Sequence, residues 1–158
     1  SDGRASIGSF SHFLPSLAAA SREAAEGNRN ASLFVFEVRE GEQLLRTFGI
    51  ESVIELMEEM GAAAHSVSKG TVQLFHYERP YQLAAIVSAV EYDAAGYLLL
   101  RVLESYSAQA WTIAGEAVFP DMIVGFSSTN QTMYQIDEMI SRAESMLASQ
   151  RFERGTPG

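Results

Sequence analysis

Two spacings of apolar residues alternate along the chain, and together they predict most of its helices and strands. Apolar side chains recur every three or four residues in several segments, which is the spacing of one face of an amphipathic helix. These segments are 8–25, 51–64, 93–107 and 136–147. A further, shorter helix is predicted to begin near Leu44 and to end at Gly49, because glycine interrupts a helical pattern.

Runs rich in apolar residues lie between these segments and predict strands, and the runs 33–38 and 83–87 predict buried ones, because a strand covered on both faces has no polar side. The longer runs are 33–38, 71–77 and 83–87, and two short strands are predicted near 111–118 and 121–127. Only the turn-like stretch 78–81 separates the second run from the third, so these two runs predict a β-hairpin.

The order of the predicted elements favours an α/β fold of the α+β type. Helices alternate with strands, but a hairpin also joins two strands directly, which is typical of a central, mostly antiparallel sheet flanked by helices. We predict one domain over residues 1–150 and a polar, disordered tail over 151–158. The first residue is not Met and the last four are irregular, which indicates a domain excised from a protein that is larger or membrane-attached.

Charge and composition exclude several functions. The net charge is −9 and the pI is near 4.7, so the chain repels a polyphosphate backbone, and no basic run offsets this. There is no cysteine, which excludes disulfides and zinc–thiolate sites. No apolar run is long enough to span a bilayer. We therefore expect a cytoplasmic domain with no nucleic acid partner and no membrane insertion of its own.

Several short segments at the ends of these elements and within them have the residue types and spacing of a sequence motif. Phe36-Glu37-Val38-Arg39 ends the first predicted strand, and Gly49 follows Phe48, twelve residues after Glu37. Arg79-Pro80-Tyr81-Gln82-Leu83 lies in the hairpin. Near the end, Ile123-Val124-Gly125-Phe126 precedes the helical segment Asp137-Glu138-Met139-Ile140-Ser141-Arg142-Ala143-Glu144.

In this spacing the chain resembles the GGDEF family of diguanylate cyclases over residues 2–150. The segment 137–144 is similar to the family's D-E-L-L-x-x-A-D, and 123–126 is similar to its S-x-G strand. Asp2 and Ile7 match the family's opening motif D-x-L-T-G-L-x-N-R, although the Thr, Gly, Asn and Arg are absent. The resemblance implies a nucleotidyl-cyclase-like sandwich.

The resemblance also implies a chemistry that this chain lacks the residues to perform. In the family, two GTP molecules meet across a dimer, and two metal ions are held by carboxylates of the first strand and the hairpin motif. Here Glu37 keeps one carboxylate, but Arg39 replaces the second. In neither register of the motif does the hairpin have the two glycines or the two acids, and Pro80 removes a backbone donor. We therefore predict no catalytic residue, no metal site and no cofactor.

Other inherited sites are also missing. The family's inhibitory cyclic di-GMP signature, R-x-x-D, corresponds here to Gly70-Thr71-Val72-Gln73. Glu42 stands in place of a basic residue that faces phosphate in the family. The three histidines show no ligand spacing with one another, so they predict no metal site of their own.

The leading hypothesis is a catalytically inactive GGDEF-like regulatory domain of a bacterial signal transduction protein. It would act through a protein partner or through self-association. The alternative is a sensor that binds cyclic di-GMP or GTP in the altered cleft; a third is an unrelated α/β enzyme with similar spacing. The candidate nucleotide or partner contacts are Glu37, Arg79, Tyr81 and Gln82.

Three of these residues also have a simpler interpretation. Glu37 could be exposed at the strand end or paired with Arg39, and this interpretation is preferred to a metal ligand. Arg79 and Tyr81 could clamp a base, contact a protein or form a plain turn. Tyrosine and arginine are enriched in interaction hot spots, which makes the loop an interface candidate.

Overall fold

The computed structural model describes residues 7–88 and 91–155, and for residues 152–155 it describes the backbone alone. Five α-helices lie in these ranges, preceded by a short 3-10 turn at Phe10–His12. The helices are α1 Phe13–Glu26, α2 Gly41–Phe48, α3 Ile50–Val67, α4 Tyr92–Ser107 and α5 Ile136–Gly155. The strands are β1 Ser32–Val38, β2 Val72–His76, β3 Gln82–Val87, β4 Trp111–Ile113, β5 Glu116–Val118 and β6 Met122–Ser128.

The main sheet has four strands in the order β2-β3-β1-β6, and each neighbouring pair is antiparallel. β1 is a central strand, with Glu37 opposite Gln82 on β3 and Ile123 on β6. All seven residues of β1 are buried, which explains its continuous apolar run. The sheet is thus the frame that brings the end of β1 beside the start of β3.

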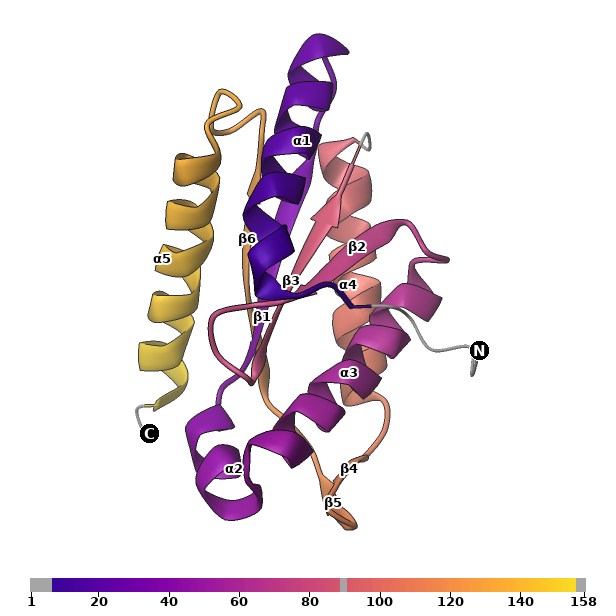
Figure 1. Ribbon diagram of the computed structural model, residues 1–158, viewed down its shortest axis with the longest axis vertical. Coiled ribbons are helices and arrows are strands. Elements are labelled where there is room, and N and C mark those ends of the chain that lie inside the picture. The colour runs from indigo at the N-terminus through magenta and orange to yellow at the C-terminus, as the bar shows by residue number, and fades with distance from the viewer. Residues whose placement is uncertain (1–6, 89–90, 156–158) are drawn as a thin grey trace.

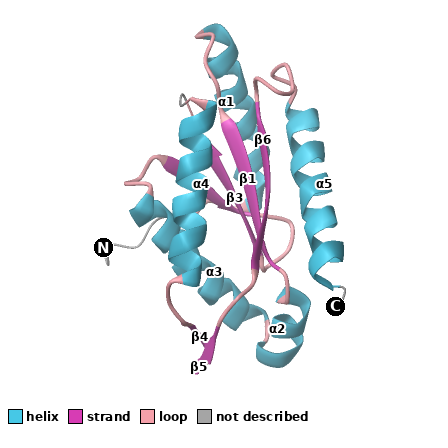
Figure 2. Ribbon diagram, turned by 180° about the vertical axis from the view of Figure 1, so that it is seen from behind, coloured by secondary structure: helices cyan, strands magenta, loops and turns pink. Residues whose placement is uncertain are grey.

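Helices cover both faces of this sheet, as Figures 1 and 2 show from opposite sides. Alternate β1 side chains enter two separate cores because successive strand residues point to opposite faces. Leu33 and Val35 pack with residues of α1 and α5, whereas Phe34 and Phe36 pack with α3 and α4. The predicted fold class, a mostly antiparallel sheet flanked by helices, is confirmed.

Helix α5 lies unusually close to β6 because Gly125 has no side chain. A Cβ atom at Gly125 would lie 2.1 Å from the carbonyl oxygen of Ala143. Only glycine fits such an approach of helix backbone to strand. The sequence motif around Gly125 therefore fixes α5 on the sheet, and α5 in turn carries Arg151 to the end of β1.

The structure corrects two predicted boundaries. The segment 111–118 is a hairpin of β4 and β5 that forms its own two-stranded sheet, because Ala114 and Gly115 both adopt positive φ and reverse the chain. Helix α5 continues to Gly155, so residues 151–155 are helical and the expected tail is shorter; 156–158 lie outside the described residues. Among the described residues, no helix is both long and apolar enough to cross a bilayer.

Candidate functional site

Glu37 lies near the end of β1 and is buried, with a relative exposure of 4%. Its partner in the register, Gln82, is the first residue of β3 and is 3% exposed. The Gln82 side chain donates from Nε2 to Glu37 Oε1 over 2.8 Å. The structure therefore joins two of the four predicted site residues directly.

The strongest partner of Glu37 comes from the far end of the chain. Arg151 donates from Nε to Glu37 Oε2 over 2.7 Å and from Nη2 to Oε1 over 2.6 Å. This two-pronged geometry matches the planar guanidinium to the planar carboxylate. The hydrogen bond to Glu37 raises the pKa of Arg151, so the arginine stays charged. Both oxygens of the buried carboxylate are thereby neutralised from inside the molecule.

The earlier interpretation of Glu37 as exposed or paired with Arg39 is wrong. Arg39 follows β1 at the turn into α2, where its backbone N–H donates to the Asp121 carbonyl over 2.9 Å. Its Nε atom also donates to Asp121 Oδ2 over 2.9 Å. Because the chain has left the strand at this point, Arg39 reaches the segment before β6 and not Glu37.

The hairpin turn between β2 and β3 is closed by Gln82. Its side-chain Oε1 accepts from the Arg79 backbone N–H over 2.9 Å, and its own N–H donates to the Arg79 carbonyl over 3.0 Å. Gln82 therefore connects Glu37 to the turn through a single amide side chain. The side chain of Arg79 is exposed.

Tyr81 is buried in the core below the turn, with a relative exposure of 7%. Its ring lies against Gly41 at the start of α2, where an added Cβ would approach the ring carbons to 2.1 Å. The hydroxyl donates to Glu42 Oε1 over 3.0 Å. Burial, followed by this bond to Glu42, raises the pKa of Tyr81 to about 12. Tyr81 thus fills the space between the hairpin and α2.

The structure places the four predicted residues in three different settings. Glu37 and Gln82 are buried and form a polar network with Arg151, Tyr81 packs against α2, and the Arg79 side chain remains at the surface. Among the residues that the structure describes, no three acidic or histidine side chains converge as a metal-binding group. Asp2, which matches the family's opening motif, lies outside the described residues.

Sequence reasoning missed Arg151 because it assigned 151–158 to a polar tail. One feature of the sequence indicated a longer helix. No glycine or proline lies between the apolar stripe of 136–147 and Arg151, so nothing in the sequence ends the helix before Arg151. The pairing itself joins residues 114 positions apart, and no local pattern contains it.

Comparisons with known proteins give no match to any family model and no match among curated proteins. Solved structures do match over nearly the whole chain. The GGDEF domain of FimX from Pseudomonas aeruginosa is 15% identical with a TM-score of 0.82, covering 97% of this chain and 96% of that one. The active GGEEF domain of a diguanylate cyclase from Vibrio cholerae is 12% identical with a TM-score of 0.77, covering 92% of each chain.

A third structure is the diguanylate cyclase SiaD from Pseudomonas aeruginosa, solved in complex with its activator SiaC. It is 18% identical with a TM-score of 0.76, and the match covers 93% of this chain and 56% of SiaD. At such identities the likeness carries the fold and not the activity. The chain has the fold of GGDEF domains, which is the fold of diguanylate cyclases.

Proposed function

We propose that this chain is a catalytically inactive GGDEF-like regulatory domain that acts through protein contacts in a bacterial signalling protein. It would work in the cytoplasm as one part of a longer chain. The observation that carries the proposal is the ion pair between the buried Glu37 and the partly exposed Arg151. Glu37 is the acid that resembles the family's first metal ligand, and here it already has a cation.

A divalent metal bound to phosphate needs hard oxygen ligands with lone pairs available to it. Both carboxylate oxygens of Glu37 accept hydrogen bonds from Arg151, and Oε1 accepts a further one from Gln82. A metal ion would have to displace a charged guanidinium that is held at two points. The hairpin residues 79–82 supply no carboxylate to assist it.

The turn is also poorly suited to hold phosphates. Pro80 has no backbone N–H, and the N–H of Arg79 already donates to Gln82. Glu42 projects a carboxylate onto the Tyr81 hydroxyl at the same end of the sheet. These features favour the loss of catalysis over a merely weakened enzyme.

The sensor alternative has less support. Tyr81 and Gln82, two of its expected contacts, are buried and already bonded within the domain. A nucleotide stacking on Tyr81 would have to pull it away from Gly41 and Glu42. The exposed Arg79 side chain is the one candidate contact that a ligand reaches without such rearrangement.

The direct test incubates the purified domain with GTP and Mg²⁺ and follows cyclic di-GMP by chromatography. An active GGDEF cyclase in a parallel reaction shows that the assay works. We expect no product from this chain, because Arg151 occupies the carboxylate that would bind the metal. Synthesis of cyclic di-GMP that Glu37→Gln abolishes would refute the proposal.

A second measurement separates the regulatory and sensor hypotheses. The domain is titrated by calorimetry with cyclic di-GMP and, separately, with GTP and Mg²⁺. We expect no binding in the micromolar range for either. Micromolar binding that is lost in Arg79→Ala would establish the sensor instead; this substitution is preferred to one at Tyr81 because Arg79 is exposed and Tyr81 is part of the core.

A further inference from the structure

A second unusual surface lies along β6, at the edge of the sheet away from β2. Helices α4 and α5 flank this strand on opposite faces of the sheet, as seen from behind in Figure 2. Apolar side chains of both helices are exposed there. Tyr97 is 69% exposed, Leu100 57%, Tyr92 41% and Met146 40%. Exposed apolar side chains gathered in one place commonly mark an interaction site.

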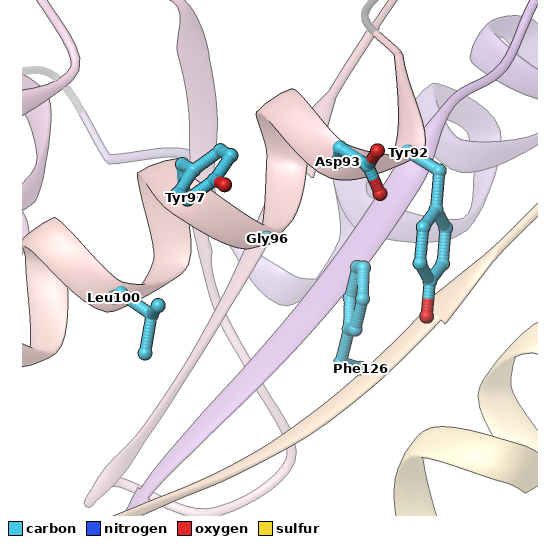
Figure 3. Close-up of a pocket in the computed structure, with 6 residues that line it drawn as sticks. All are labelled: Tyr92, Asp93, Gly96, Tyr97, Leu100 and Phe126. Carbon is cyan, nitrogen blue, oxygen red and sulfur yellow. The ribbon is translucent and has the colours of Figure 1, made fainter.

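These side chains surround a hollowed surface rather than a flat one. Two hollows of ≈ 360 Å³ and ≈ 410 Å³ share Tyr92 and Phe126 and so form one groove. The rings of Tyr92 and Phe126, which line both hollows, lie side by side with centroids 5.4 Å apart, as Figure 3 shows. Tyr97 and Leu100 line it on α4, and Met146 lines it on α5.

The groove is not built to accept an added β-strand. An edge strand normally offers its backbone N–H and C=O groups for pairing. On β6 the Gln150 side chain bonds both the N–H and the C=O of Val124, and the Phe126 N–H donates to Met146 Sδ over 3.4 Å. Because α5 already satisfies these groups, a partner would have to bind through side chains.

We infer that this groove binds an amphipathic α-helix of another protein, with an apolar stripe flanked by lysine or arginine. The small residues Gly96, Ser141 and Ser145 line the groove and leave room for a helix backbone. The aromatic and aliphatic lining suits anchors at every third or fourth residue of such a helix.

The charge of the whole chain favours one kind of helix. The groove lining contains one acid, Asp93, and one base, Arg142, and is neutral by itself, whereas the whole chain carries a net charge of −9 and attracts a basic partner. A second copy of the chain brings the same −9 and is disfavoured for that reason. The inference rests on the proposed function only in that both require protein recognition, because the groove shares no residue with the Glu37 network.

The test selects binders from a displayed library of helices about 18 residues long, or five turns. Apolar residues are fixed along one stripe, and the flanking positions vary between acidic, neutral and basic. Leu100→Glu serves for counter-selection. Ile50→Glu is its matched control, because Ile50 is 55% exposed, lies on a helix outside the groove and gives the same change of charge.

We expect enriched helices with basic flanks, which bind the original chain and Ile50→Glu alike and Leu100→Glu about tenfold more weakly by fluorescence anisotropy. Absence of enrichment, enrichment of acidic flanks, or equal binding to Leu100→Glu would each overturn the inference. A dimer detected by sedimentation and lost in Leu100→Glu would assign the groove to a second copy instead. The cyclase assay is independent of all these outcomes, so the two proposals fail separately.

Discussion

The end of β1 and the groove along β6 differ from the usual burial of side chains in opposite ways. At the first, a charged carboxylate is 4% exposed, although charged groups are rarely buried. At the second, Tyr97 and Leu100 are 69% and 57% exposed on a helix whose other face is core. A charged side chain is therefore buried in the first region, and apolar side chains are exposed in the second.

The difference between them lies in where the partner is found. Glu37 has its partners inside the molecule, in Arg151 and Gln82, so its burial is already compensated. The apolar side chains of the groove are exposed to water, and the partner helix inferred above would remove them from it. An internally satisfied site suits a domain that has lost chemistry, whereas an unsatisfied apolar groove suits one that recognises a protein.

The largest effect should follow from removing the internal partner of Glu37. Arg151→Met leaves a carboxylate that is 5% exposed without its cation. Arg151 is itself 41% exposed, so water partly replaces it, and the loss is no larger than the roughly 3 kcal/mol of breaking a fully buried pair. We expect the free energy of unfolding, measured with urea, to fall by about 2 to 3 kcal/mol.

Two controls test whether the lost charge partner is the cause. Arg22→Met removes an exposed arginine of α1 and should change stability by no more than about 0.5 kcal/mol. The double variant Glu37→Leu with Arg151→Met replaces the whole pair by apolar groups and should recover most of the loss. A double variant as unstable as Arg151→Met alone would show that packing, not charge, dominates here.

A second prediction compares one glycine from each region. Gly41→Ala forces a methyl group against the Tyr81 ring and should destabilise the domain by about 2 kcal/mol, as overpacking does. Gly96→Ala meets no atom within 4 Å and should stabilise α4 by up to about 1 kcal/mol. Thermal unfolding of the two variants checks both signs. Equal shifts of the melting temperature in the same direction would contradict the tight packing of Gly41 against Tyr81 and the open space beside Gly96.

The fold could largely be predicted from the sequence because apolar spacing reports burial locally. The buried run of β1 and the hairpin of β2 and β3 are confirmed close to their predicted boundaries. The β4–β5 hairpin was missed because its turn places Ala114 at φ 48°, a conformation that alanine rarely adopts. Gly115 is the local turn signal there, but a single glycine within an apolar run also fits a strand.

The site was less predictable because its contacts are non-local. Glu37, Gln82 and Tyr81 were singled out from family spacing, but their burial and mutual bonding depend on how distant segments meet. Arg151 and the β6 groove both depend on the placement of α5, which Gly125 fixes by close approach to Ala143. A helical stripe indicates that a helix packs somewhere, but it does not indicate which residues lie beside its last turn.

A smaller effect is expected for the hydroxyl group of Tyr81. Tyr81→Phe keeps the ring on Gly41 but removes the bond to Glu42, which should cost about 1 kcal/mol at neutral pH. The folded pKa is about 12, against 10.0 ordinarily, so the neutral phenol is favoured by folding. Above pH 10 the unfolded chain releases this proton first, and stability therefore falls as pH rises toward 12.

Urea unfolding at several pH values between about 9 and 12 measures this fall. The free energy of unfolding should fall less steeply with pH in Tyr81→Phe, because the proton of the Tyr81 hydroxyl no longer contributes. Tyr77 and Tyr106, whose pKa values burial also raises, should maintain the remaining slope. An unchanged dependence of stability on pH in Tyr81→Phe would mean that the Tyr81 hydroxyl is accessible to solvent. The space between the hairpin and α2 would then be open to ligands.

The smallest effect on stability should come from the groove. Leu100→Ser removes a side chain that is 57% exposed, so unfolding should change by no more than about 0.5 kcal/mol. The neighbouring Leu99→Ser is the control, because Leu99 is 9% exposed and its loss should cost about 2 kcal/mol or more. If Leu100→Ser proved as costly as Leu99→Ser, Leu100 would be part of the core. Its exposure could then no longer be assigned to a partner helix.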